Sequence, residues 1–132
     1  MRFVHDPAKL AGLVDAAVRR FVHRRVRQIV GDDEWVSEQH GMLIVVDPGD
    51  TLDQLERESG VSLLRDAFGD TQYGHPDFVP GCEALEDHGF LFEMTFVLND
   101  DGYGVVFIIP KQDGIDADLL SMCATFAVSV RD

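Results

Sequence analysis

The sequence predicts one α+β domain that spans residues 1–132, with a long N-terminal helix and a largely antiparallel sheet of three to five strands covered by helices. Three observations predict this fold. Apolar residues recur at steps of three and four over residues 7–30, residues 42–46 form an apolar run rich in β-branched side chains, and two apolar segments flank a turn at 99–102. The first pattern is typical of an amphipathic helix, and the other two are typical of strands and a hairpin.

The N-terminal helix is predicted over residues 7–30. Pro7 suits the first turn, and Asp6 is placed to cap it by accepting a free backbone N–H. Gly31 follows the last apolar position, as expected of a helix end. The apolar stripe consists of Leu10, Leu13, Val14, Ala17, Val18, Phe21, Val22, Val26, Ile29 and Val30.

A strand and a second helix follow. Met42–Val46 is predicted to be a central strand buried on both faces, and a short strand is also expected at Trp35–Glu38. Pro and Gly at 47–50 end the central strand. Thr51 and Gln54 then have the spacing of a capping box, which predicts a helix that begins at this point.

The middle of the chain is predicted to be less regular. One or two helical turns are predicted at residues 61–68, and a loop rich in Gly and Pro is predicted at residues 69–81. A long loop in a small domain is often functional. A short helix is predicted at 82–88.

A hairpin and a final helix complete the domain. Strands are predicted at Phe90–Leu98 and at residues 103–109, on either side of the Asp-Gly turn at 99–102, because Asp and Gly accept the positive φ of hairpin turns. Residues 116–127 have an acidic first turn and an apolar face, which predicts the last helix.

The net charge excludes some classes of partner. The chain has 24 Asp and Glu against 11 Lys and Arg, a formal net charge of −13. Such a field repels phosphate backbones and anionic lipids, so we expect no direct binding to nucleic acid or membranes. The sequence has neither a transmembrane-length apolar run nor the apolar core of a signal peptide. With Cys82 and Cys123 interpreted as free thiols, we expect a cytoplasmic protein.

The charge is divided unequally along the chain. Residues 1–27 have seven basic and two acidic side chains, a charge of +5, whereas residues 28–132 have four basic and 22 acidic ones, a charge of −18. Five of the basic residues are arginines between positions 19 and 27. We expect them to form a solvated helix face that pairs with the acidic body. The alternatives are a surface for an acidic partner or nucleic acid and a surface for self-association.

The sequence contains no motif for a bound phosphate, a nucleophilic serine, a zinc protease or an EF-hand. His75, Cys82 and His88 include the residue types of a zinc site or a Cys–His pair, but their spacing matches no known pattern. We therefore expect no metal, no cofactor and no catalytic residue.

Glu93 interrupts the apolar strand at 90–98. Strand alternation places it on the face of Leu91 and Thr95, opposite Phe92. The phenylalanine face is predicted to be core, and the Glu93 face to meet solvent or line a cleft. The carboxylate is interpreted as a polar group on the outer sheet face, with a catalytic acid or a partner contact as alternatives.

We expect a small, acidic, bacterial protein without enzymatic activity that binds a basic partner protein. Immunity proteins, antitoxins and anti-restriction inhibitors are the concrete forms of this hypothesis, since complementary charge gives such proteins speed and specificity. The predicted partner contacts are acidic, aromatic or imidazole side chains: Trp35, Tyr73, His75, Asp77, Glu83, Glu86, Asp87, Asp100, Asp101 and Tyr103.

Two other functions remain open. One is a small ligand-binding domain or enzyme with a cleft between the sheet and the 69–81 loop, lined in part by Glu93. The other is a structural module that forms a homodimer through helix 7–30, whose apolar stripe is wide for so small a domain.

Overall fold

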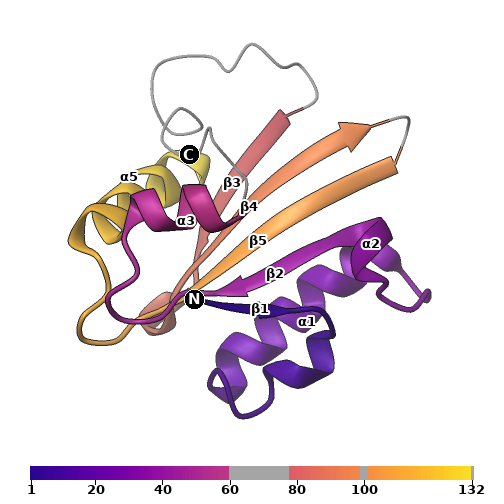
Figure 1. Cartoon of the computed structure of the whole chain (residues 1–132), viewed down its shortest axis with the longest axis horizontal. Coiled ribbons are helices and arrows are strands. Elements are labelled where there is room, and N and C mark those ends of the chain that lie inside the picture. The colour runs from indigo at the N-terminus through magenta and orange to yellow at the C-terminus, as the bar shows by residue number, and fades with distance from the viewer. Residues whose placement is uncertain (60–77, 99–100, 132) are drawn as a thin grey trace.

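Five strands form one sheet in the computed structural model of the protein, which describes residues 1–59, 78–98 and 101–131. The strands are β1 (Arg2–Val4), β2 (Gly41–Val45), β3 (Phe78–Ala84), β4 (Gly89–Leu98) and β5 (Asp101–Pro110). The helices are η1 (Pro7–Leu10), α1 (Ala16–Val30), α2 (Ser37–His40), α3 (Leu52–Ser59), η2 (Glu86–His88) and α5 (Ala117–Arg131), where η denotes a 3-10 helix. α1 lies on one face of the sheet, and α3 and α5 lie on the other (Figure 1).

The sheet is mixed but mostly antiparallel. Its strand order is β1-β2-β5-β4-β3, and the β2–β5 pair is parallel whereas the other three pairs are antiparallel. The predicted α+β class and C-terminal hairpin are confirmed, but the turn is shorter than predicted, because Asp101 and Gly102 already pair with β4. Residues 99–100, which join the strands, lie outside the described residues. β2 lies between β1 and β5 and is buried on both faces, as its composition predicts.

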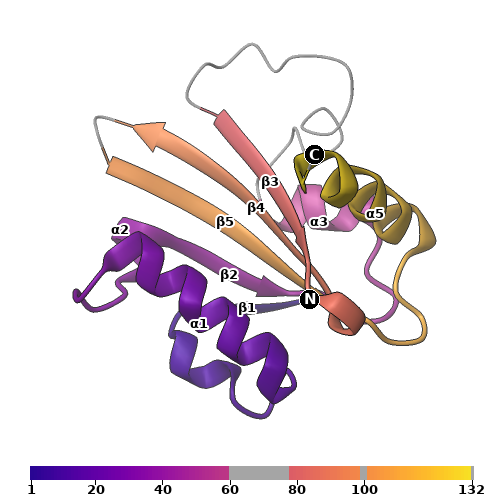
Figure 2. The same cartoon turned by 180° about the vertical axis from the view of Figure 1, so that it is seen from behind.

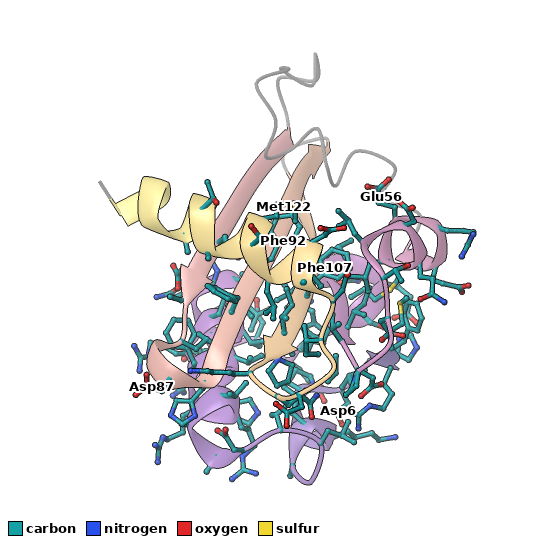
Figure 3. All side chains as sticks on the ribbon, turned by 90° about the vertical axis from the view of Figure 1, so that its left-hand side faces the viewer. Asp6, Glu56, Asp87, Phe92, Phe107 and Met122 are labelled. Atoms are coloured by element: carbon teal, nitrogen blue, oxygen red, sulfur yellow. The ribbon has the colours of Figure 1, made fainter. Side chains whose placement is uncertain are left out.

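Each face of the sheet has its own apolar core. α1 lies along one face of the sheet (Figure 2), and its Val18, Val22 and Val26 side chains pack in the core on that face. Toward α3 and α5, Phe92 and Phe107 are fully buried and stacked, with ring centroids 5.5 Å apart. Figure 3 shows this pair between α5 and the strands. α1 therefore buries the middle of its apolar stripe within its own chain, whereas Ile29 near its end is 37% exposed.

The prediction of one helix over residues 7–30 is wrong at its N-terminal end. Asp6 does act as a cap, but the element that it caps is the short η1. Gly12 then takes a φ of 87°, a left-handed conformation that interrupts helical geometry. α1 begins only after Asp15, which caps it. The predicted end of the helix at Gly31 is confirmed.

Two further segments differ from the prediction. The expected strand at residues 35–38 is replaced by α2, and the expected helix at 82–88 is replaced by the end of β3 and by η2. Residues 78–81 of the predicted loop also belong to β3. The rest of that loop, 69–77, and the helical turns predicted at 61–68 lie outside the described residues.

Strand pairing explains why β3 replaces a helix. Glu83 and Ala84 have high helix propensity, but both belong to β3, whose seven residues pair with β4. That pairing also buries Cys82 against the α5 side of the sheet. Long-range contacts thus override local preference, which is a weak determinant by comparison.

The start of α3 confirms the predicted capping box. Thr51 N donates to Gln54 Oε1 at 2.9 Å, and Gln54 N donates to Thr51 Oγ1 at 3.2 Å. The final helix is also confirmed, although α5 extends beyond the predicted end at residue 127. Both helices cover the core of Phe92 and Phe107.

Candidate functional site

The residues predicted to contact a partner fall into two groups at opposite ends of the sheet. Glu83, Glu86 and Asp87 belong to the end of β3 and the β3–β4 connection, whereas Asp101 and Tyr103 lie at the start of β5. The ten residues of β4 separate these ends by about 30 Å. One small patch therefore does not contain them all. The residues that lie outside the described part of the chain are Tyr73, His75, Asp77 and Asp100.

Trp35 belongs with the second group, because it precedes α2, which leads into the start of β2. Its side chain is half-buried and packs against the core beneath α1. The indole ring lies 5.6 Å from the ring of His40, and its buried Nε1 has no hydrogen-bond partner among the described residues. Trp35 therefore contributes to packing as well as to any partner contact.

Three connections that carry carboxylates meet at the end of the sheet where β2 and β5 finish. Hydrogen bonds join them: Gly49 N donates to Gly114 O at 3.1 Å, and Lys111 N donates to His88 O at 2.8 Å. Asp87 lies on the surface of this region (Figure 3). We define the acidic end as Asp47, Asp50, Glu83, Asp87, Asp113, Asp116 and Asp118.

Only part of the acidic end is neutralised within the described chain. Asp47 and Asp50 pair with the Met1 ammonium, and Arg2 donates to both oxygens of Asp47 at 2.7 and 3.1 Å. Burial opposes the charged ammonium, but the hydrogen bond and charge of Asp50, with Asp47, raise the pKa of the Met1 amine above its usual value. The exposed carboxylates that form no ion pair with any described residue are those of Glu83, Asp87, Asp113 and Asp118.

The expected pairing of the α1 arginines with the acidic body is found for one of them, and none forms an ion pair with the acidic end among the described residues. The pKa of Arg25 is nevertheless raised by the charge of Glu83 in addition to the larger effect of its hydrogen bond with Glu93. Arg25 pairs with Glu93 and donates to Gln28 Oε1 at 3.0 Å. The remaining arginines of the cluster form no ion pair with the described residues: Arg19, Arg20, Arg24 and Arg27. Much of α1 is therefore an uncompensated cationic surface.

Glu93 lies beneath α1 and is only 7% exposed. Its Oε2 accepts a hydrogen bond from Arg25 Nε at 2.6 Å. That hydrogen bond raises the pKa of Arg25 despite the opposing effect of burial. Leu91, on the same face of β4, is also buried, so both faces of the strand are core. The structure therefore places Glu93 in an anchor between α1 and the sheet.

A pocket of about 430 Å³ lies between α1 and the β3–β4 connection. Its wall combines basic and apolar side chains: Arg20, Arg24 and His88 with Ala17, Phe21, Ala84 and Leu85. The guanidinium carbon of Arg24 lies 5.4 Å from the centre of the Phe21 ring, a cation–π distance. The pocket therefore offers positive charge beside an apolar surface.

His88 is held at the edge of this pocket by Asp15. Its Nδ1 lies 3.1 Å from Asp15 Oδ2, and since a carboxylate accepts, Nδ1 donates. The other oxygen of Asp15 accepts from Val18 N at 2.9 Å. The bond from Val18, followed by that from His88, lowers the pKa of Asp15. Both oxygens of the Asp15 carboxylate are thus engaged.

The sequence predicts only one wall of this pocket. The spacing of Arg20 and Arg24, one helical turn apart with Phe21 beside them, is visible in the sequence. The opposite wall, at residues 84–88, is not visible in the sequence, because the local pattern predicts a helix at 82–88. No local pattern indicates that they approach α1.

Cys82 and Cys123 are both fully buried, and Cys82 Sγ donates to Cys123 O at 3.6 Å. The hydrogen bond with Cys82, together with burial, raises the pKa of the Cys123 thiol. We expect both thiols to react with Ellman's reagent at least about 100-fold more slowly in the native protein than in urea, because the reactive thiolate is disfavoured and shielded. Rapid labelling of one thiol in the native protein would contradict the expected protection of both. The single variants Cys82→Ala and Cys123→Ala would then identify the reactive thiol.

Among the described residues, no group of three or more His, Cys, Asp or Glu side chains is arranged to hold a metal ion. No described helix has both the length and the apolar character needed to span a bilayer. Comparison with known proteins found no matching family, no matching curated protein and no matching solved structure.

Proposed function

We propose that the protein is a non-enzymatic binding protein that recognises a basic partner protein through its acidic end. An inhibitor of the immunity, antitoxin or anti-restriction type is the most concrete form of this proposal. The observation that supports it is the gathering of exposed carboxylates without ion pairs, from β3, the β3–β4 connection, the β5–α5 connection and α5, at one end of a rigid sheet.

The geometry favours recognition by charge. The connections are fixed to one another by backbone hydrogen bonds, so the carboxylates of Glu83, Asp87 and Asp113 extend from a framework that does not need to be ordered on binding. Complementary charge accelerates association and selects between partners, and its effect weakens as salt screens it. Binding is therefore expected to be faster and tighter at low ionic strength.

The two alternatives have less support. Glu93 is buried and paired with Arg25, and the loop residues expected to line a cleft with it lie outside the described residues. The wide stripe that favoured a dimer through helix 7–30 packs on the sheet of its own chain, at Val18, Val22 and Val26. The stripe therefore no longer favours a dimer.

The test measures binding of purified basic proteins encoded by genes adjoining that of this protein, by calorimetry at 50 and 300 mM NaCl. We expect one of them to bind, and the triple variant Glu83→Lys, Asp87→Lys, Asp113→Lys to bind it at least about tenfold more weakly. The matched control reverses three exposed acids at the other end of the sheet, with equal change of charge: Asp32→Lys, Asp33→Lys and Glu34→Lys.

The control variant is expected to keep its affinity within about threefold, because the reversed charges lie at the other end of the sheet, farther from the acidic end than the Debye length of ~10 Å at 0.1 M salt. Equal losses in the two triple variants would show a response to net charge alone and would overturn the assignment to the acidic end. Failure of every neighbouring basic protein to bind would overturn the proposed function.

A further inference from the structure

We propose that the pocket between α1 and the β3–β4 connection binds a small organic anion, in which a phosphate or carboxylate group is joined to an apolar or aromatic moiety. This inference does not depend on the proposed function, because it uses the cationic residues of α1 and not the acidic end. The pocket volume of about 430 Å³ is within the range of small-molecule sites.

The positive charge in the pocket is not neutralised by the described chain. Arg20 and Arg24 form no ion pair with a described residue, whereas Arg25 on the same helix is paired with Glu93. Their i, i+4 spacing places them about 6 Å apart at the Cβ atoms, on one side of α1. Two guanidinium groups at this separation can hold one anionic group between them, with several charge-assisted hydrogen bonds.

The geometry of the site is partly fixed before a ligand arrives. Arg24 lies over the Phe21 ring, and His88 is oriented by its hydrogen bond to Asp15. Both oxygens of Asp15 are already engaged, by His88 and by Val18 N. The Asp15 carboxylate is therefore held by contacts other than the arginines.

The apolar wall selects a particular type of anion. Phe21 and Leu85 line the pocket beside the arginines and offer no hydrogen bond from their side chains to a fully hydrated ion. An aromatic or aliphatic group attached to the anion can displace water from this wall, which adds favourable free energy in proportion to the apolar area buried. A long polyanion is disfavoured, because the acidic remainder of the chain repels it.

The test uses phenyl phosphate and benzoate as probes, with inorganic phosphate and benzyl alcohol as the corresponding fragments. We expect at least one organic anion to bind with a Kd of about 1 mM or tighter, and at least about fivefold more tightly than either fragment. Amide chemical shifts in ¹⁵N spectra locate the site, and the expected changes centre on Phe21 and His88. The organic anion that binds with the lower Kd shows whether the pocket prefers a phosphate or a carboxylate group.

Two double variants of equal charge provide the matched comparison. Arg20→Ala with Arg24→Ala is expected to weaken binding at least about tenfold, whereas Arg19→Ala with Arg27→Ala, on the same helix but outside the pocket, changes it less than about threefold. Equal losses in both variants would overturn the pocket. Binding of inorganic phosphate or benzyl alcohol as tight as that of the organic anions, or no binding at all, would also overturn it. Circular dichroism of each variant verifies that α1 is intact.

Discussion

Replacement of Phe107 by alanine is expected to lower the free energy of unfolding by about 3–5 kcal/mol. The ring is fully buried on β5, the central strand, and stacks on Phe92 with an angle of 16° between the ring planes. Its removal leaves a cavity between the sheet and the helices α3 and α5, in a region where neighbouring side chains can relax only partly. Urea unfolding at 25 °C, followed by circular dichroism, measures the change.

Two variants distinguish loss of packing from a general effect of mutation. Phe107→Leu keeps most of the buried volume and is expected to cost about 1–2 kcal/mol. Phe3→Ala removes a ring that is 39% exposed on the edge strand β1 and is expected to cost about 1 kcal/mol or less. A cost below about 1.5 kcal/mol for Phe107→Ala would contradict a closely packed core on this face.

The elements that the sequence predicts well are those with strong local signals. The hairpin joins two apolar strands, although Asp101 and Gly102 of the predicted turn pair with β4 as the first residues of β5. The start of α3 has a capping box whose two hydrogen bonds are both present. β2 is apolar and rich in β-branched residues, because it is buried on both faces. In each case neighbouring residues determine the structure, so a short window of sequence contains the necessary information.

The elements that the sequence predicts poorly depend on distant residues. β3 is a strand because it pairs with β4, although its last residues have high helix propensity. β1 has only three residues, too few for a periodic signal, and exists through its pairing with β2. The apolar stripe at 7–30 continues across the left-handed Gly12, so periodicity alone did not reveal the break.

The same distinction applies to the candidate sites. The sequence shows how many carboxylates the chain has, but only the fold shows that Glu83, Asp87 and Asp113 reach one end of the sheet. Residue type alone places Asp101 and Tyr103 in the same group of partner contacts, but the length of β4 separates these two residues from the acidic end. The arginine pocket needs residues 84–88 opposite α1, which no local pattern indicates.

Replacement of Arg25 by methionine is expected to lower the free energy of unfolding by about 2–3 kcal/mol. Loss of one partner of a fully buried ion pair costs about 3–5 kcal/mol, and the lower value expected here allows for screening by water, since the Arg25 side chain is 36% exposed. Glu93→Met should cost less, about 1 kcal/mol, because the remaining guanidinium can turn toward solvent. Urea unfolding of both single variants and of the double variant gives the coupling energy.

The double variant is expected to be no less stable than Arg25→Met alone, which corresponds to a coupling of about 1–2 kcal/mol between the side chains. The pair formed by Arg2 and Asp47 is the matched control: the two side chains are 40% and 29% exposed, and a coupling below about 1 kcal/mol is expected. A coupling below about 0.5 kcal/mol for Arg25 and Glu93 would contradict an anchoring role. A larger coupling in the buried pair than in the exposed one would agree with a contribution from burial, because the exposed pair has the more extensive contacts: Arg2 binds both oxygens of Asp47, which also pairs with the Met1 ammonium. Such a result would show that Glu93 helps to hold α1 on the sheet. α1 forms one wall of the pocket that Arg20 and Arg24 line.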